Sequence, residues 1–148
     1  MRNRFKIEGL RETERALSDL PRATAKNVTR RVLRRRAEPI ERAAEANAPT
    51  LSGALKEDVK TGTRLSRRQA GMNRRMGKSE VEVHVGVVDP AGVQTEFGNE
   101  HQDAEPWLRP AWDANWRGAL DGIADDLWNE TKKAADRAAR KAARLARG

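Results

Sequence analysis

The chain has 148 residues, of which 35% are charged and 37% hydrophobic, and its formal net charge is +8. This length is sufficient for one domain with a hydrophobic core. The absence of cysteine excludes disulfide bonds, a thiol nucleophile and a thiolate metal site. The excess of positive charge favours a negatively charged partner, which can be nucleic acid, an anionic membrane surface or an acidic protein.

Two features of the sequence bear on where the protein is found. No apolar run approaches the roughly 20 residues that are needed to span a bilayer. The N-terminal sequence MRNRFK lacks the apolar core of a signal peptide. We therefore expect a protein that has no membrane contact and stays in a cytoplasm unless it leaves as part of an assembly.

The N-terminal third predicts a strand followed by two helices. Residues 3–10 alternate apolar and polar side chains, which is typical of a short strand. Residues 11–20 predict a short helix, and residues 22–47 a long one, because their apolar residues recur at a spacing of three and four. Pro39 lies inside the long helix. Because proline removes a backbone donor, we expect it to kink this helix or to divide it in two.

Residues 55–64 and 80–89 predict two antiparallel strands. In the second strand four valines alternate with mostly polar residues, so we expect one face to be buried. The segment between the strands predicts a long hairpin loop that is basic and contains no acidic residue. Its cations, with the one at the end of the first strand, are Arg64, Arg67, Arg68, Arg74, Arg75 and Lys78.

Residues 106 to about 146 predict a long helix with Pro106 or Pro110 in its first turn. Its large apolar residues form a stripe that we expect to dock on the sheet. The stripe consists of Leu108, Trp112, Trp116, Leu120, Ile123 and Leu127. After Trp128 the helix is rich in Ala, Lys and Arg, so we expect it to be solvated or to pack only on a neighbour.

The predicted elements together indicate an α+β fold. It consists of a long N-terminal helix, a small antiparallel sheet with a long basic hairpin loop, and a long C-terminal helix packed on the sheet. We expect residues 1–128 to form a single domain and residues 129–148 to form a basic, Ala-rich helical extension.

The stretch from residue 93 to residue 113 is rich in acidic residues, which raises the question of a metal or acid–base site. Such sites require ligands that are held in fixed geometry, usually on rigid elements. These side chains fall on an expected loop without a recognisable ligand spacing, so we interpret the stretch as a structural joint. We expect no catalytic residue, no metal and no cofactor. The side chains considered are Glu96, Glu100, His101, Asp103 and Glu105.

Basic residues concentrate in three segments: residues 22–36, the predicted hairpin loop and the C-terminal tail. One interpretation is that these are ordinary solvated surfaces. The other is contact with phosphates without reading of the base sequence. No aromatic residue is interleaved with these cations, which disfavours stacking on single-stranded bases.

Four sequence segments follow one another in an order that resembles a known family. The first is Ile7–Leu10 with Leu17–Pro21, similar to I-x-G-L…L-x-x-L-P, and the second is Ala46–Leu55, similar to A-x-A-P-x-x-T-G-x-L with Ser52 in place of the threonine. The third is Val83–Gly86, similar to a strand that ends in Val-Gly. The fourth is Glu96–Gly98 with Pro106–Ala111, similar to E-F-G…P-F-L-R-P-A with Trp107 in place of the phenylalanine. The chain resembles the gene-product-ten-like tail-completion, or head–tail joining, proteins of lambdoid long-tailed bacteriophages.

This resemblance implies a structural virion protein and not an enzyme. Its members are expected to form a homo-oligomeric ring, sixfold or twelvefold, at the neck between the capsid portal and the tail tube. The implied partners are neighbouring neck and tail-tube proteins and, transiently, the packaged double-stranded DNA. Assembly would take place in the host bacterial cytoplasm.

The resemblance also assigns roles to the joint and to the basic loop. The joint consists of Glu96, Phe97, Gly98, Pro106, Trp107, Leu108, Arg109 and Pro110. In it, Phe97 and Leu108 lock a passage from strand to helix, Gly98 supplies a tight turn, and Arg109 pairs with a carboxylate such as Glu96. The basic hairpin loop is a candidate for the DNA-channel lining or the subunit interface.

Two further classes of function stay open from the sequence. A cytoplasmic DNA-binding protein without sequence specificity would share the charge but would not need the neck motifs. A metal-dependent nuclease would need the carboxylates of residues 96–105 to converge on a metal ion.

Overall fold

The computed structural model describes residues 10–50, 54–73 and 76–148. The strand that we expected at residues 3–10 falls outside these ranges except for Leu10, which begins the first helix. The α+β class, the two long helices and the small antiparallel sheet are confirmed.

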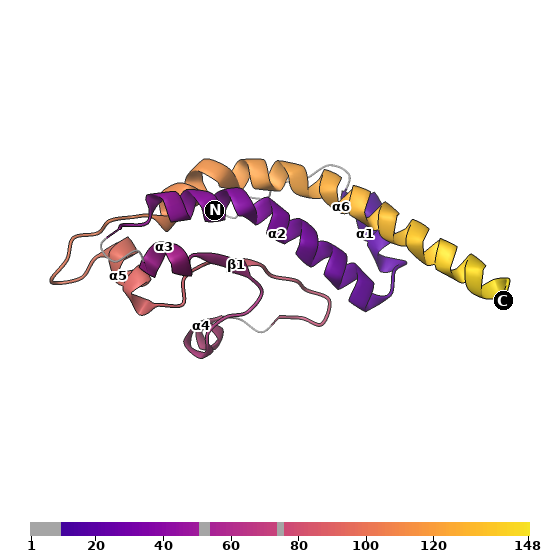
Figure 1. Cartoon of the computed structure of the whole chain (residues 1–148), viewed down its shortest axis with the longest axis horizontal. Helices are drawn as coiled ribbons and strands as arrows, with labels where there is room; N and C mark the ends of the chain where they lie inside the picture. The colour runs from indigo at the N-terminus through magenta and orange to yellow at the C-terminus, as the bar shows by residue number, and fades with distance from the viewer. Residues whose placement is uncertain (1–9, 51–53, 74–75) are drawn as a thin grey trace.

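Two long antiparallel helices form the frame of the molecule (Figure 1). Helix α2 runs from Arg22 to Asn47 and helix α6 from Leu108 to Ala146. The short helix α1, Leu10–Ser18, packs against both. α2 is one unbroken helix through Pro39, so the expected division at this proline is wrong. Extensive packing along α6 holds α2 in register, which offsets the hydrogen bond that Pro39 cannot donate.

The sheet is smaller than the sequence predicts. Strand β1, Lys60–Gly62, pairs antiparallel with β2, His84–Gly86, and Thr61 lies opposite Val85. The first half of the expected strand at residues 55–64 is instead helix α3, Ala54–Asp58. Because β1 offers only three residues for pairing, the preceding part of the expected second strand, residues 80–83, has no ladder.

Two other short helices replace segments that we expected to be irregular. Helix α4, Arg67–Met72, lies inside the predicted hairpin loop and begins with a capping box, in which Ser66 and Gln69 exchange hydrogen bonds. Helix α5, Pro90–Phe97, occupies part of the expected acidic loop.

The core lies where small residues let α2 approach α6. One buried cluster consists of Ala44, Ala48, Val59, Trp107 and Ala111. A second cluster, farther along the helix pair, consists of Leu20, Val28 and Ala134. The buried part of α6 therefore extends past Trp128 to Ala134, and residues 135–148 are exposed.

The expected docking of the α6 stripe on the sheet is indirect. α6 packs along α2, and α2 in turn contacts β1 and β2. Trp112, which belongs to the stripe that we expected to dock on the sheet, is 53% exposed, whereas Trp116 is partly buried and Trp107 is buried. The stripe and the valines of residues 83–87 face each other across an open groove.

Candidate functional site

The joint between α5 and α6 is built around the carboxylate of Glu96. This side chain is buried at the end of α5 and accepts hydrogen bonds from three successive main-chain N–H groups at the start of α6. The donors are Trp107 at 2.7 Å, Leu108 at 2.8 Å and Arg109 at 3.0 Å. A helix N-terminus has N–H groups without acceptors and the positive end of the helix dipole. One carboxylate accepts hydrogen bonds from these N–H groups and places a negative charge at the positive end. Glu96 therefore caps α6 from a different helix.

Trp107 fixes the other half of the joint. Its side chain is 1% exposed, and its indole N–H donates to the Gly92 carbonyl at 3.1 Å. Its own carbonyl accepts a hydrogen bond from the Asn47 side chain at the end of α2. At Gly92 an added Cβ would collide with Val87. Only glycine fits there because α5 lies so close to the strand region.

Gly98 reverses the chain between the two helices. It ends α5 with a φ of 74°, which L-residues with a Cβ rarely adopt. An added Cβ would lie 2.8 Å from the Ala104 nitrogen. The loop is closed by a turn at residues 99–102 and by the Glu105 N–H, which donates to the Thr95 carbonyl at 2.8 Å.

The structure differs from two expected details of the joint. Phe97 is 64% exposed and lies at the end of a helix, so it does not lock a passage from strand to helix. The Arg109 guanidinium lies over the Phe97 ring, 5.4 Å from its centroid. Within the described structure this guanidinium forms no ion pair with Glu96. The contact between Glu96 and Arg109 is made by the Arg109 main-chain N–H.

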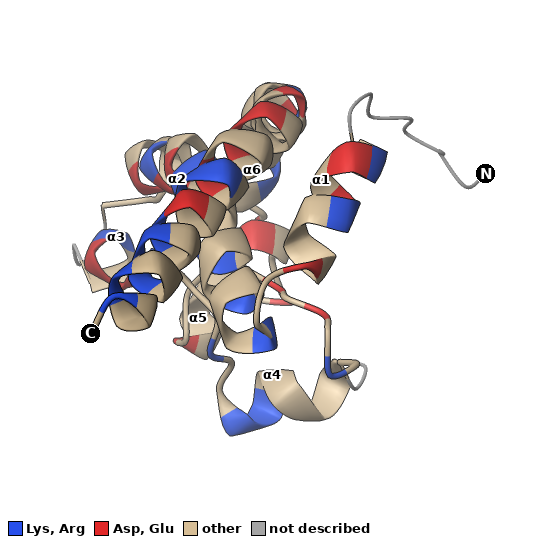
Figure 2. Ribbon diagram, turned by 90° about the vertical axis from the view of Figure 1, so that its right-hand side faces the viewer, with Lys and Arg blue, Asp and Glu red and all other residues tan. Residues whose placement is uncertain are grey.

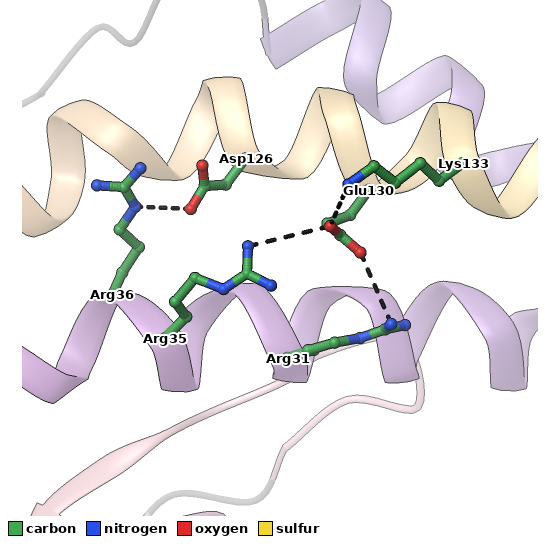
Figure 3. Close-up of polar contacts among 6 residues, drawn as sticks. All are labelled: Arg31, Arg35, Arg36, Asp126, Glu130 and Lys133. Carbon is green, nitrogen blue, oxygen red and sulfur yellow. Dashed lines mark hydrogen bonds and ion pairs between the residues drawn. The ribbon is translucent and has the colours of Figure 1, made fainter.

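Ion pairs connect the middle of α2 with α6 (Figure 3). The Arg36 guanidinium donates to Asp126 at 2.7 Å. Farther along, Glu130 lies among three cations: Lys133 at 3.2 Å, Arg31 at 3.6 Å and Arg35 at 3.9 Å. Three arginines of the basic segment 22–36 thus face carboxylates of α6 within the chain, and Arg36 donates a hydrogen bond to one of them.

These cations change the titration of the two carboxyls. The hydrogen bond from Arg36 holds the pKa of Asp126 below its ordinary value of 3.8, although burial opposes the effect. The hydrogen bond from Lys133 and the charges of Arg31 and Arg35 likewise hold the pKa of Glu130 below 4.5, again against burial. Both acids are therefore more stable in the charged form in the folded chain.

The four candidate DNA-contact residues that the structure describes lie on the surface but not on one loop. Arg64 follows β1, Arg67 and Arg68 are on α4, and all three are exposed. Lys78 is exposed in a turn, and its carbonyl accepts a hydrogen bond from Lys26 of α2. The other two candidates, Arg74 and Arg75, lie outside the described residues. Seen from the C-terminal end, Lys and Arg occur on α2 and α4 (Figure 2).

The acidic residues of the joint do not converge. Glu96 points into the core, whereas Glu100, Asp103 and Glu105 are exposed on the loop that follows, and Glu100 pairs with His101 at 3.1 Å. Within the described ranges, no group of three or more His, Cys, Asp or Glu side chains is arranged to hold a metal ion. None of the helices in these ranges combines the length and apolar character that crossing a membrane requires.

An apolar groove opens beside the joint. Its volume is about 620 Å³, and α2, the valines around β2, α5 and α6 all contribute to its lining. The residues at its open edge include Val93, Phe97 and Trp112, each more than half exposed. Monomeric proteins rarely leave aromatic surface of this kind uncovered, so the groove is a candidate for contact with another protein.

The sequence reasoning missed the capping role of Glu96, helix α5 and the ion pairs of α6. α5 had a visible signal: Asp89 caps the helix through the Ala91 N–H, Pro90 occupies its first turn, and Gly98 ends it. Lys133 pairs with Glu130 at the local spacing of three on one helix. The arginines of α2 that face Asp126 and Glu130 are distant in the sequence, and no local pattern indicates them.

Comparison with known proteins gives one match. A protein-family model described as "Bacteriophage HK97-gp10, putative tail-component" matches residues 11–98, more than half of the chain. No curated protein and no solved structure matches the chain. The matched segment ends at Gly98, the residue that closes α5, and so includes Glu96 but not α6.

Proposed function

The chain belongs to the HK97-gp10-like family of bacteriophage tail components, and from this premise we propose that it forms a ring at the head–tail neck of a tailed particle. There it would complete the tail or join it to the capsid portal complex around the DNA channel. The particle can be a phage, a prophage product or a gene-transfer particle. In this proposal the chain is a structural component of the virion and not an enzyme.

The observation that carries the proposal, beyond the family, is the uncovered groove beside a rigid joint. Glu96 and Trp107 hold α5 and α6 in a fixed relation through buried hydrogen bonds. The groove edge next to them exposes Phe97 and Trp112. Aromatic residues on a rigid support are characteristic of the centres of protein–protein interfaces. This arrangement fits a subunit that is completed by neighbours.

The basic surface residues fit weak contact with DNA inside such a ring. Arg64, Arg67, Arg68 and Lys78 are exposed, and with Arg74 and Arg75 they are the proposed channel-facing or subunit-facing cations. Phosphate contacts by a few such side chains carry no sequence information and weaken with salt. Passing DNA would require contacts of this kind and not tight sites.

The alternative, a cytoplasmic DNA-binding protein, is less well supported. It would need the α2 cluster as a phosphate-binding face. However, Arg31, Arg35 and Arg36 already face carboxylates of α6. The cation–π contacts among the described residues involve Arg109, Arg117 and Lys132, and none of them involves a cation of α4.

Deletion of the gene from the genome that encodes it tests the proposal. We expect filled heads and tails that fail to join, or tails of abnormal length, by electron microscopy of the lysate. A plasmid copy should restore joined particles. Normal particles without the gene would refute a neck role. Tight, salt-sensitive binding of duplex DNA by the free chain would then favour the alternative.

A further inference from the structure

The apolar groove carries the features of an interface that is occupied by a helix. Phe97, Val93 and Trp112 are exposed along its edge, and Arg109 covers one face of the Phe97 ring. α-helices commonly bind in such grooves through apolar residues spaced three and four apart. The occupant should therefore present a narrow apolar face.

The end of α6 is an unpartnered helix with such a face. From residue 135 to the C-terminus every residue is exposed, although the chain is helical to Ala146. One side of this tail carries only small residues and one leucine, and the opposite side carries the cations. The apolar side consists of Ala135, Ala138, Ala139, Ala142, Leu145 and Ala146.

The tail and the segment that carries the groove edge have charges of opposite sign. Residues 135–148 contain five basic residues against the single acid Asp136. Residues 89–113, which form α5, the loop and the start of α6, contain six acids against the single base Arg109. The exposed acids of this segment, which also supplies Val93, Phe97 and Trp112 to the groove, are Asp89, Glu100, Asp103, Glu105 and Asp113. Oppositely charged surfaces of this kind steer association and fix its orientation.

A chain cannot place its own tail in its own groove. α6 is a continuous helix of 39 residues (Figure 1). Its N-terminal end lines the groove, through residues such as Leu108 and Trp112, and the tail forms its other end. At a rise of 1.5 Å per residue these ends are separated by about 58 Å. A contact between them has to join two copies.

We infer that the tail helix, residues 135–147, of one subunit occupies the groove of a neighbouring copy. Leu145 and the alanines lie against Phe97 and Trp112, and the tail cations face Glu100 and Asp103. Such a contact joins unlike surfaces, head to tail, and its repetition around an axis closes a ring. The inference rests on the proposed ring and names the surfaces that build it.

Charge reversal in matched pairs of variants tests this contact. The first variant, Arg140→Glu with Arg144→Glu, reverses the tail. The second variant, Glu100→Lys with Asp103→Lys, reverses the groove edge. The control for the first variant is Arg11→Glu with Arg15→Glu on α1. It has the same charge change and the same spacing of four as the tail variant, and its side chains are also exposed. Circular dichroism checks that each variant keeps its helix content.

The readout is the mass in solution by sedimentation velocity over a range of protein concentrations and at two salt concentrations. We expect the wild-type chain to associate, and its dissociation constant to rise when the salt is raised from 0.05 to about 0.5 M, because the charges are exposed. Each reversed variant should associate at least 10-fold more weakly, and the control should not change. An equimolar mixture of the two reversed variants should associate again, because its opposite charges are restored in trans.

Three results would overturn the inference. They are a wild-type chain that stays monomeric at all concentrations, reversed variants that associate like the control, and a mixture that does not recover. A ring of normal mass from the tail-reversed variant would refute this contact and leave the neck proposal intact. If Phe97→Asp then abolished binding to a tail-tube or neck protein, the groove would belong to that protein and not to the tail.

Discussion

Replacing Glu96 with glutamine removes the charge from the carboxylate that caps α6. Three main-chain N–H groups donate to this side chain at 2.7–3.0 Å, and the side chain is 6% exposed. A hydrogen bond to a charged group contributes about 1.5–3 kcal/mol, and a helix cap about 1 kcal/mol. The three bonds share one carboxylate, so these values do not add. Glutamine keeps one acceptor oxygen but turns an NH₂ group toward an N–H donor.

We expect Glu96→Gln to lower the free energy of unfolding by about 2 kcal/mol, and the melting temperature by about 6 °C for a chain of this size. Glu96→Ala should lower it by about 3–4 kcal/mol, because it also leaves buried N–H groups unsatisfied. Urea unfolding followed by tryptophan fluorescence measures both, since Trp107 adjoins the carboxylate. An unchanged m-value is needed for the comparison.

Glu100→Gln is the matched control, because Glu100 lies on the next loop with its side chain 84% exposed. This change should cost less than about 0.5 kcal/mol. A Glu96→Gln midpoint equal to that of the control would show that the carboxylate does not stabilise the joint. The reasoning about the cap would then be refuted.

Three other substitutions test other parts of the structure by the same urea assay. Gly98→Ala should lower the free energy of unfolding by about 2 kcal/mol, because φ is 74° and the loop leaves no room for a Cβ. Its control, Gly118→Ala in the open part of α6, should raise the free energy of unfolding by up to about 1 kcal/mol, and equal effects of the two changes would contradict this reasoning. Asp126 has a lowered pKa, so its stabilisation is present above pH 3.8 and is lost as the pH falls through its folded pKa. Asp126→Asn, which weakens the bond to Arg36, should therefore lose less stability between pH 7 and pH 3 than the wild-type chain does, and an equal loss would argue against the ion pair. The Thr131 hydroxyl is buried without a hydrogen-bond partner in the described structure, so Thr131→Val should stabilise by about 1 kcal/mol, and a loss would indicate an unseen partner.

The long helices were predictable because each repeats one pattern over many turns. The apolar positions of α2 and α6 recur at helical spacing, and the expected bounds of α2, residues 22–47, agree with the structure. A long amphipathic pattern depends little on its partner. The short elements, in contrast, depend on the segments with which they pair or pack. The sequence pattern predicts a strand at residues 55–64, although Ala54–Asp58, which forms α3, is composed largely of good helix formers. Val81 and Val83 lie outside the ladder, because the three residues of β1 pair with His84–Gly86.

The candidate site was predictable in position but not in chemistry. Glu96, Gly98 and Trp107 all belong to the observed joint. The partners of Glu96, however, are main-chain N–H groups, which every residue except proline carries. No side-chain pattern could indicate which of the acids in this stretch would turn inward. The same limit applies to Arg36 and Asp126, which meet only because α2 and α6 are antiparallel.

The distribution of charge over the chain connects the two proposals. A net charge of +8 suggests strong attraction to DNA, but half of it lies on the tail, residues 135–148, which carries five basic residues and one acid. In a ring closed by the tail–groove contact, these cations face the carboxylates of a neighbour. The exposed cations that remain available include those around α4, such as Arg67 and Arg68. Each phosphate contact adds to the salt dependence of DNA binding. DNA binding by the assembled ring should therefore be weaker per subunit, and less sensitive to salt, than binding by the dissociated chain. A ring that binds DNA as tightly as the free chain would place the tails in the channel and not in the grooves.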